Sequence, residues 1–221
     1  MEFIFKAITL RDIIKEACVE TFEEAILAEK KGADRIELCS RLDLDGLTPE
    51  RKIVEKVLGA LSIPIKIMIR PRPGNFSYND QELNRMKEDI LFCKDLSVQG
   101  VVFGLLDQNK TIDMENMKYL SDTADNLEIT FHKAIDQTDS IIDEIDRLLT
   151  IGSISSVLTS GGAYNAHAGS RLLKKALEKY ENIITIIPAG SITKNNIHEL
   201  HQIIGAKEYH GRKIVGDLDP N

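Results

Sequence analysis

Residues 32–39, with the sequence GADRIELC, and residues 65–70, with the sequence IKIMIR, decide how this chain folds. In both stretches apolar residues alternate with charged or sulfur-containing ones, which is the period of a β-strand. Gly32 ends a preceding helical pattern, and Thr48-Pro49 predicts the start of the next helix, with Thr48 as its cap. The order is therefore helix, strand, helix, strand, which is typical of parallel strands joined by helical crossovers.

The same alternation continues along the rest of the chain. Apolar stripes of helical period predict seven helices, and short β-branched runs predict eight strands at residues 13–18, 35–39, 64–70, 100–106, 127–132, 156–160, 183–188 and 206–210. Eight such units favour an α/β fold of the TIM (β/α)8-barrel type. A doubly wound open sheet is the alternative architecture.

No linker, low-complexity tract or change of composition divides the sequence, so we predict one domain over residues 1–221. Residues 1–12 form an N-terminal segment and residues 211–221 a short tail. This tail is too short for a regular eighth helix. We therefore expect the N-terminal segment or a second subunit to cover that part of the barrel, and we predict a homo-oligomer.

Composition excludes several classes of function. The chain carries 28 Lys and Arg against 35 Asp and Glu, a net charge of −7, and it has no basic run, which argues against nucleic-acid binding. No apolar stretch approaches the length of a membrane span, and the first residues do not resemble a secretion signal. The three cysteines show no disulfide pattern, so we predict a cytoplasmic protein.

Strand parity predicts a charged barrel interior. Because the isoleucines and leucines of each strand must face the helices, the alternate side chains turn inward. For Lys66 and Glu128 we favour a structural ion pair low in the barrel. The carboxyl ends of the strands are where such barrels carry their chemistry, and the inward residues with candidate functions are Glu16, Cys18, Glu37, Cys39, Arg70, His132 and His210.

Loops at the same rim suggest binding of an anion. Arg70 and Arg72 lie on a segment stiffened by two prolines and could bind a carboxylate or phosphate, and Lys133 follows His132 directly. Glycine-containing turns after the sixth and seventh predicted strands offer backbone N–H groups to an anion, at Ser160, Gly161, Gly162 and Gly190. Elsewhere we expect Cys93 to pack in the core and His198 and His201 to lie on a solvated helix face.

Several strings resemble the CutC family in their order and spacing, over about residues 16–210. They are GADRIELC at 32–39, GLTP at 46–49, MIRPR at 68–72, TFH at 130–132 and LTSGG at 158–162. The resemblance implies a TIM-type barrel, a cytoplasmic and usually oligomeric protein, and a role in copper homeostasis. Copper binding is attributed in this family to cysteines near the first strands, which correspond to Cys18 and Cys39 here.

Three hypotheses about function follow. Thiolates select Cu(I), so Cys18 and Cys39 on neighbouring strands could bind one copper ion. Alternatively, Glu16, Glu37, His132 and His210 could supply acid–base catalysis on a small anionic substrate, in an isomerase or lyase type of reaction. A scaffold protein with an ion-paired interior is the third possibility.

Overall fold

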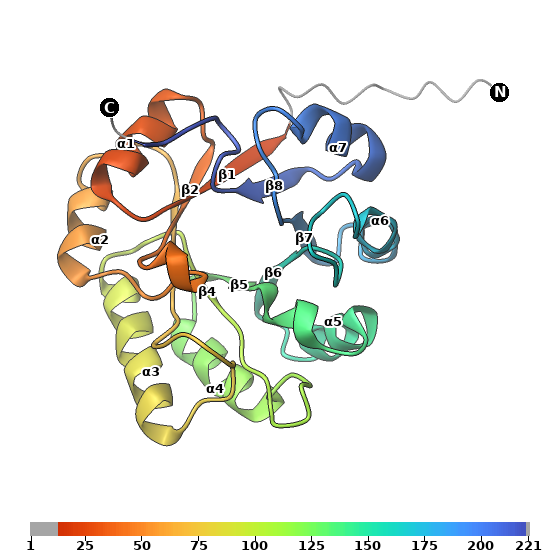
Figure 1. Cartoon of the computed structure of the whole chain (residues 1–221). Helices are drawn as coiled ribbons and strands as arrows, with labels where there is room; N and C mark the ends of the chain where they lie inside the picture. The colour runs from red at the N-terminus through yellow and green to blue at the C-terminus, as the bar shows by residue number, and fades with distance from the viewer. Residues whose placement is uncertain (1–12, 220–221) are drawn as a thin grey trace.

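The computed structural model describes residues 13–219, and its eight strands form one parallel sheet rolled into a barrel (Figure 1). Each strand sits close to its predicted place, usually with fewer residues than the apolar run. The strands are β1 (Ile14–Val19), β2 (Arg35–Leu38), β3 (Ile65–Met68), β4 (Gly100–Phe103), β5 (Glu128–Phe131), β6 (Ile154–Thr159), β7 (Thr185–Pro188) and β8 (Glu208–Gly211).

Within the described residues, seven α-helices surround the barrel, as the apolar stripes predict (Figure 1). Two of them begin with a reciprocal capping box, formed by Thr21 with Glu24 and by Asn79 with Glu82. The helices are α1 (Phe22–Lys30), α2 (Arg51–Leu58), α3 (Asp80–Asp95), α4 (Met114–Ala124), α5 (Ile141–Leu149), α6 (Ser170–Lys179) and α7 (Ile197–Ile204), with short 3-10 turns η2 (Leu42–Leu44) and η3 (Lys133–Gln137).

The strand order distinguishes the barrel from the open-sheet alternative. Hydrogen-bonded neighbours follow the order β7-β6-β5-β4-β3-β2-β1-β8. Strands β1 to β7 therefore lie in sequence order and β8 pairs with β1, without the reversal that marks a doubly wound sheet. β7 and β8 meet at the remaining seam, where the segments that follow them are joined by a bridge between Thr193 and Lys213. The barrel prediction is therefore confirmed, with a nearly closed ring of strands.

The predicted parity of the strands is also confirmed. Ile36 and Leu38 are fully buried against the helices, whereas the side chain of Glu37 between them turns into the barrel. Lys66 lies low in the interior, with its Nζ 3.3 Å from Glu128 Oε2 and 3.0 Å from Thr130 Oγ1. These contacts account for Lys66 and Glu128 as structural partners, as the sequence suggests.

Three local expectations need correction or qualification. Thr48 does not cap α2, which begins at Arg51 with Glu50 as its N-cap. The Thr48 hydroxyl instead accepts a hydrogen bond from the backbone N–H of Arg70, so it ties the β2–α2 loop to the end of β3.

His201 is not solvated, because it is buried beside Tyr209, with His201 Nδ1 3.1 Å from the Tyr209 hydroxyl. Residues 212–219, after β8, form no helix, and the predicted cover by residues 1–12 falls outside the described residues.

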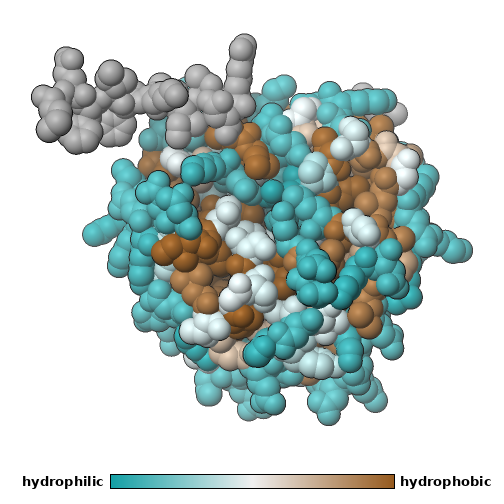
Figure 2. All heavy atoms as spheres, turned by 180° about the vertical axis from the view of Figure 1, so that it is seen from behind, coloured by the Kyte–Doolittle hydropathy of each residue, from teal (hydrophilic) through white to brown (hydrophobic). Residues whose placement is uncertain are grey.

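The outside of the barrel follows ordinary helix amphipathicity. Cys93 lies on the buried face of α3 among core side chains, as expected. Figure 2 shows one face of the molecule, where hydrophobic side chains in the middle are framed by hydrophilic ones around the edge. No helix among residues 13–219 combines the length and the hydrophobicity of a membrane span.

Candidate functional site

A cavity of about 590 Å³ lies at the carboxyl ends of the strands, the end at which such barrels place their chemistry. All of the seven inward candidate residues except Glu16 line it, and these six come from strands or strand ends spread around the ring. They are Cys18, Glu37, Cys39, Arg70, His132 and His210. The alternation of short strands therefore brings these side chains together, although they are far apart in the sequence.

The two cysteines form a close sulfur pair in the wall of this cavity. The Sγ atoms of Cys18 and Cys39 lie 3.8 Å apart, and both side chains are buried with Met68 in one small apolar cluster. The Cys39 Sγ also lies 3.5 Å from Glu37 Oε2. The hydrogen bond from Cys39 and the nearby His210 lower the pKa of Cys18 to about 5, despite its burial. The same hydrogen bond and burial raise the pKa of Cys39 well above its ordinary value. The pair therefore consists of one thiolate and one thiol.

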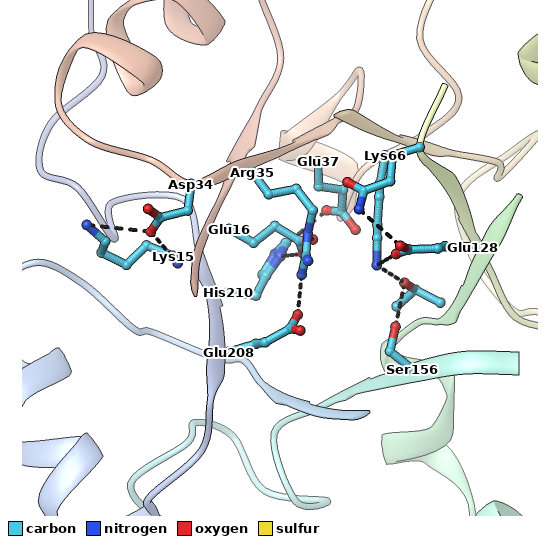
Figure 3. A network of polar contacts seen from close by, with 12 residues as sticks. Lys15, Glu16, Asp34, Arg35, Glu37, Lys66, Glu128, Ser156, Glu208 and His210 are labelled. Carbon is cyan, nitrogen blue, oxygen red and sulfur yellow. Dashed lines mark hydrogen bonds and ion pairs between the residues drawn. The ribbon is translucent and has the colours of Figure 1, made fainter. Parts of the chain in front are cut away.

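Glu16, two residues before Cys18 on β1, anchors a polar network in the barrel interior (Figure 3). His210 Nδ1 lies 2.8 Å from Glu16 Oε1, and the guanidinium of Arg35 donates to Oε2 of Glu16 and to Glu208. Burial opposes ionisation of Glu16, but the hydrogen bond with His210 and the charge of Arg35 lower its pKa to about 2. Sequence reasoning missed Arg35 as a member of this network, although it has the same strand parity as Glu37.

His210 connects this network to the cavity. Its Nε2 lies 3.6 Å from Glu37 Oε2, while its Nδ1 faces Glu16. Burial disfavours the imidazolium, but the neighbouring Glu37, Cys18 and Glu16 outweigh it and hold the pKa of His210 well above its usual value. Burial in turn raises the pKa of Glu37 well above its ordinary range, against the attraction of His210. The pKa values of His210 and Glu37 are thus both raised within one network that also contains the Glu16 carboxylate and the Cys18 sulfur.

His132 and Arg70 form another part of the cavity wall. The ring of Phe76 contacts both, with its centroid 4.8 Å from that of His132 and 4.9 Å from Arg70 Cζ. The backbone N–H of Ala134 donates to His132 Nδ1. Burial and the charge of Arg70 lower the pKa of His132 to about 3, so its imidazole is neutral. Sequence reasoning did not single out Phe76. This residue lies in a loop, where the alternation of side chains along a strand does not apply.

The predicted anion-binding loops are only partly brought to the cavity. Lys133 and Gly190 line it, as does Asp136, which the sequence analysis did not consider. Arg72 points elsewhere and pairs with Glu82. The backbone N–H groups of Ser160 and Gly162 donate to the Asp136 carboxylate, and the N–H of Gly161 donates to Thr159 Oγ1. These donors are therefore already satisfied within the protein.

The fold and the site together define a class of protein: a (β/α)8 barrel whose carboxyl-end cavity joins a buried pair of thiols to buried carboxylate and imidazole groups. The model of the CutC family matches residues 13–215, and the chain belongs to this family.

Relatives of the chain cover most of its length. A human protein called "Copper homeostasis protein cutC homolog" is 38% identical over 93% of this chain and 75% of its own length. A CutC family protein of Enterococcus faecalis is 37% identical over 92% of this chain and 100% of its own length. The crystal structure described as a copper homeostasis protein CutC from Streptococcus agalactiae superimposes with a TM-score of 0.85 at 32% identity, over 91% of this chain and 99% of that chain.

Proposed function

We propose that this protein acts in copper homeostasis by binding Cu(I) through Cys18 and Cys39, in the cytoplasm. The observation that carries the proposal is the 3.8 Å separation of their sulfur atoms in the wall of an accessible cavity. Metal–sulfur bonds are about 2.3 Å long, so one ion can reach both atoms. Copper homeostasis is also what the names of the human and mouse relatives state of those proteins.

The chemistry of the donors fits Cu(I). Thiolates are the soft ligands that this ion prefers, and Cys18 is already ionised at neutral pH because the pKa of its thiol is about 5. Met68, a residue with a thioether sulfur, packs in the same cluster. All three cysteines in the described residues are free thiols, which fits the reducing cytoplasm that we propose as the protein's location. When copper binds, Cys39 must release its proton, so binding is coupled to pH.

A competition titration tests this proposal. Reduced protein is titrated anaerobically with Cu(I) in the presence of a chromophoric Cu(I) chelator. We expect the wild-type protein to bind one Cu(I) per chain, and a Cys18→Ser/Cys39→Ser variant to bind at least roughly tenfold more weakly. Cys93→Ser is the matched control, because Cys93 is equally buried but lies in the core on α3. Equal affinity of the double variant and the wild type would refute the proposal.

A further inference from the structure

The cavity contains polar atoms that no group in the protein satisfies. Among the described residues, Arg70 Nε, His132 Nε2 and Glu37 Oε1 are buried without a hydrogen-bond partner, and all three residues line this cavity. Buried polar atoms in folded proteins are almost always hydrogen-bonded, because desolvation without a partner is costly. Three such atoms around one cavity therefore indicate a ligand that supplies the missing hydrogen bonds.

Arg70 carries a buried charge that lacks a counter-ion. One terminal nitrogen of its guanidinium donates to the backbone carbonyls of the η2 turn region at 44–46, and the other donates to the carbonyl of Gly74. These acceptors are neutral, and no carboxylate within residues 13–219 forms an ion pair with Arg70, which is 3% exposed. The guanidinium is thus held by neutral groups, and its Nε has no hydrogen-bond partner. The Tyr78 hydroxyl, which is likewise buried without a partner, lies near the same guanidinium. A buried cation in this state favours an anion beside it.

His132 supplies a second donor of defined orientation. Because its Nδ1 accepts the N–H of Ala134, the neutral imidazole carries its proton on Nε2. That N–H is buried in a residue that is 4% exposed and has no acceptor in the protein. The rings of His132 and Phe76 contact each other, and the guanidinium of Arg70 lies over the same Phe76 ring. The two free N–H donors therefore flank one aromatic side chain.

We propose that the Arg70 and His132 side of the cavity binds a small organic carboxylate, whose oxygen atoms accept hydrogen bonds from Arg70 Nε and His132 Nε2. The one buried guanidinium and the two free N–H donors match a planar monoanion. Lys133, Arg212 and Lys213 also line the cavity, so inorganic phosphate is the alternative anion that the test must include. The cavity volume, about 590 Å³, suits a small molecule, and Phe76, Leu158 and Ala189 provide apolar surface for its carbon atoms. This site shares the cavity with the sulfur pair but does not depend on copper.

Calorimetric titration of the metal-free protein tests the proposal. The probes are acetate, pyruvate and succinate, with acetamide as the neutral counterpart of acetate and inorganic phosphate as the alternative anion. We expect at least one carboxylate to bind saturably, and to bind more tightly than acetamide or phosphate. Absence of saturable carboxylate binding, or equal binding of acetamide, would overturn the proposal. Tighter binding of phosphate would also overturn it.

One variant and its matched control test whether His132 donates to the bound carboxylate. His132→Asn keeps an acceptor for the N–H of Ala134 but removes the Nε2 donor, so we expect carboxylate binding to weaken roughly tenfold or more. Arg72→Gln is the matched control, because this nearby arginine pairs with Glu82 and does not line the cavity. The carboxylate affinity of this variant should equal that of the wild type. Unchanged affinity in His132→Asn would contradict the assignment.

A second measurement does not depend on any variant folding. In the wild-type protein, the imidazole ¹⁵N resonances of His132 should report a neutral ring with its proton on Nε2, and the Nε2 resonance should shift when the carboxylate is added. A resonance that does not respond to a bound carboxylate would overturn the proposal. Carboxylate binding should be unchanged in Cys18→Ser/Cys39→Ser, so a failure of the copper proposal and a failure of this one are distinguishable.

Discussion

Cys18 is paired in register with Glu37 across β1 and β2, yet its sulfur lies 3.8 Å from that of Cys39, two residues further along the chain. Glu37 on β2 and Cys39, the residue directly after this strand, both point into the barrel, so Cys18 contacts the residue opposite it and the next inward residue. The proximity of the sulfurs thus comes from the sheet itself. The Glu37 side chain lies next to the two sulfurs, because Cys18, Glu37 and Cys39 place their potential ligand atoms within 4.8 Å of one another.

The first prediction concerns the reactivity of Cys18. Because the hydrogen bond from Cys39 and the charge of His210 hold the pKa of Cys18 at about 5, its thiolate should react with iodoacetamide at pH 6. The rate should fall as the pH is lowered through about 5. Peptide mass spectrometry after short exposures measures the alkylation of each cysteine.

Cys93 and Cys39 serve as internal controls in the same sample. Burial raises the pKa of Cys93 to about 12, and Cys39 is likewise shifted upward, so neither should be alkylated at pH 6. Equal labelling of the three cysteines would contradict the thiolate assignment. Loss of Cys18 labelling in the presence of Cu(I) would further place the ion on this sulfur.

The second prediction concerns the carboxylate of Glu16. Glu16→Gln leaves Arg35 and His210 without their shared negative partner in the barrel interior, and removing one member of a buried ion pair costs about 3 kcal/mol or more. The folded-state pKa of Glu16, about 2, lies below its ordinary value of 4.5, so its contribution is present above pH 4.5 and is lost as the pH falls toward 2. Denaturant unfolding should show a large difference at pH 7 that narrows by pH 3.

Lys66→Met provides the contrasting case, and is the third prediction. Lys66 is almost fully buried, but the Glu128 side chain is 45% exposed and can be hydrated when its partner is removed. Thr130 and Ser156 keep their mutual hydrogen bond at 2.8 Å. Replacing such a lysine by an apolar residue of similar size should therefore change the free energy of unfolding by no more than about 1 kcal/mol. A loss as large as that of Glu16→Gln would show that Lys66 supports the whole interior network.

Much of the fold and of the site followed from the strand pattern. In residues 65–70 the alternation decides both the strand and the face on which Lys66 lies, because a side-chain period of two leaves only one register that buries the isoleucines. The same rule placed Cys18, Glu37 and His210 at one cavity. The family resemblance added copper, which no spacing in the sequence indicates.

Loop side chains could not be placed in the same way. Arg72 and Arg70 are two residues apart, but a loop has no fixed period, and Arg72 turns to Glu82 while Arg70 faces the cavity. The N–H groups around Gly161 resemble an anion site until Asp136 is found to occupy two of them. Such contacts depend on three-dimensional packing between segments, which local pattern does not encode.

The last prediction concerns the pH dependence that His132 imposes on stability. Burial and the charge of Arg70 lower its pKa to about 3 from an ordinary value of 6.5, so the native protein excludes a proton that the unfolded chain binds. Its stabilising contribution is complete above pH 6.5 and is lost as the pH falls from 6.5 toward 3. Between pH 7 and pH 5, this residue alone should reduce the free energy of unfolding by about 2 kcal/mol.

The variant His132→Asn removes the contribution of His132 to the pH dependence, because asparagine does not titrate. Its side-chain oxygen can still accept the N–H of Ala134. Between pH 7 and pH 5, the free energy of unfolding should therefore fall by about 2 kcal/mol less in the variant than in the wild type. Urea unfolding at each pH measures this difference. His210 and Glu37, whose pKa values are raised, act in the opposite direction and are common to both proteins, so they cancel in the comparison. Parallel pH profiles for the two proteins would show that the His132 imidazole is hydrated in solution and not buried as a neutral donor.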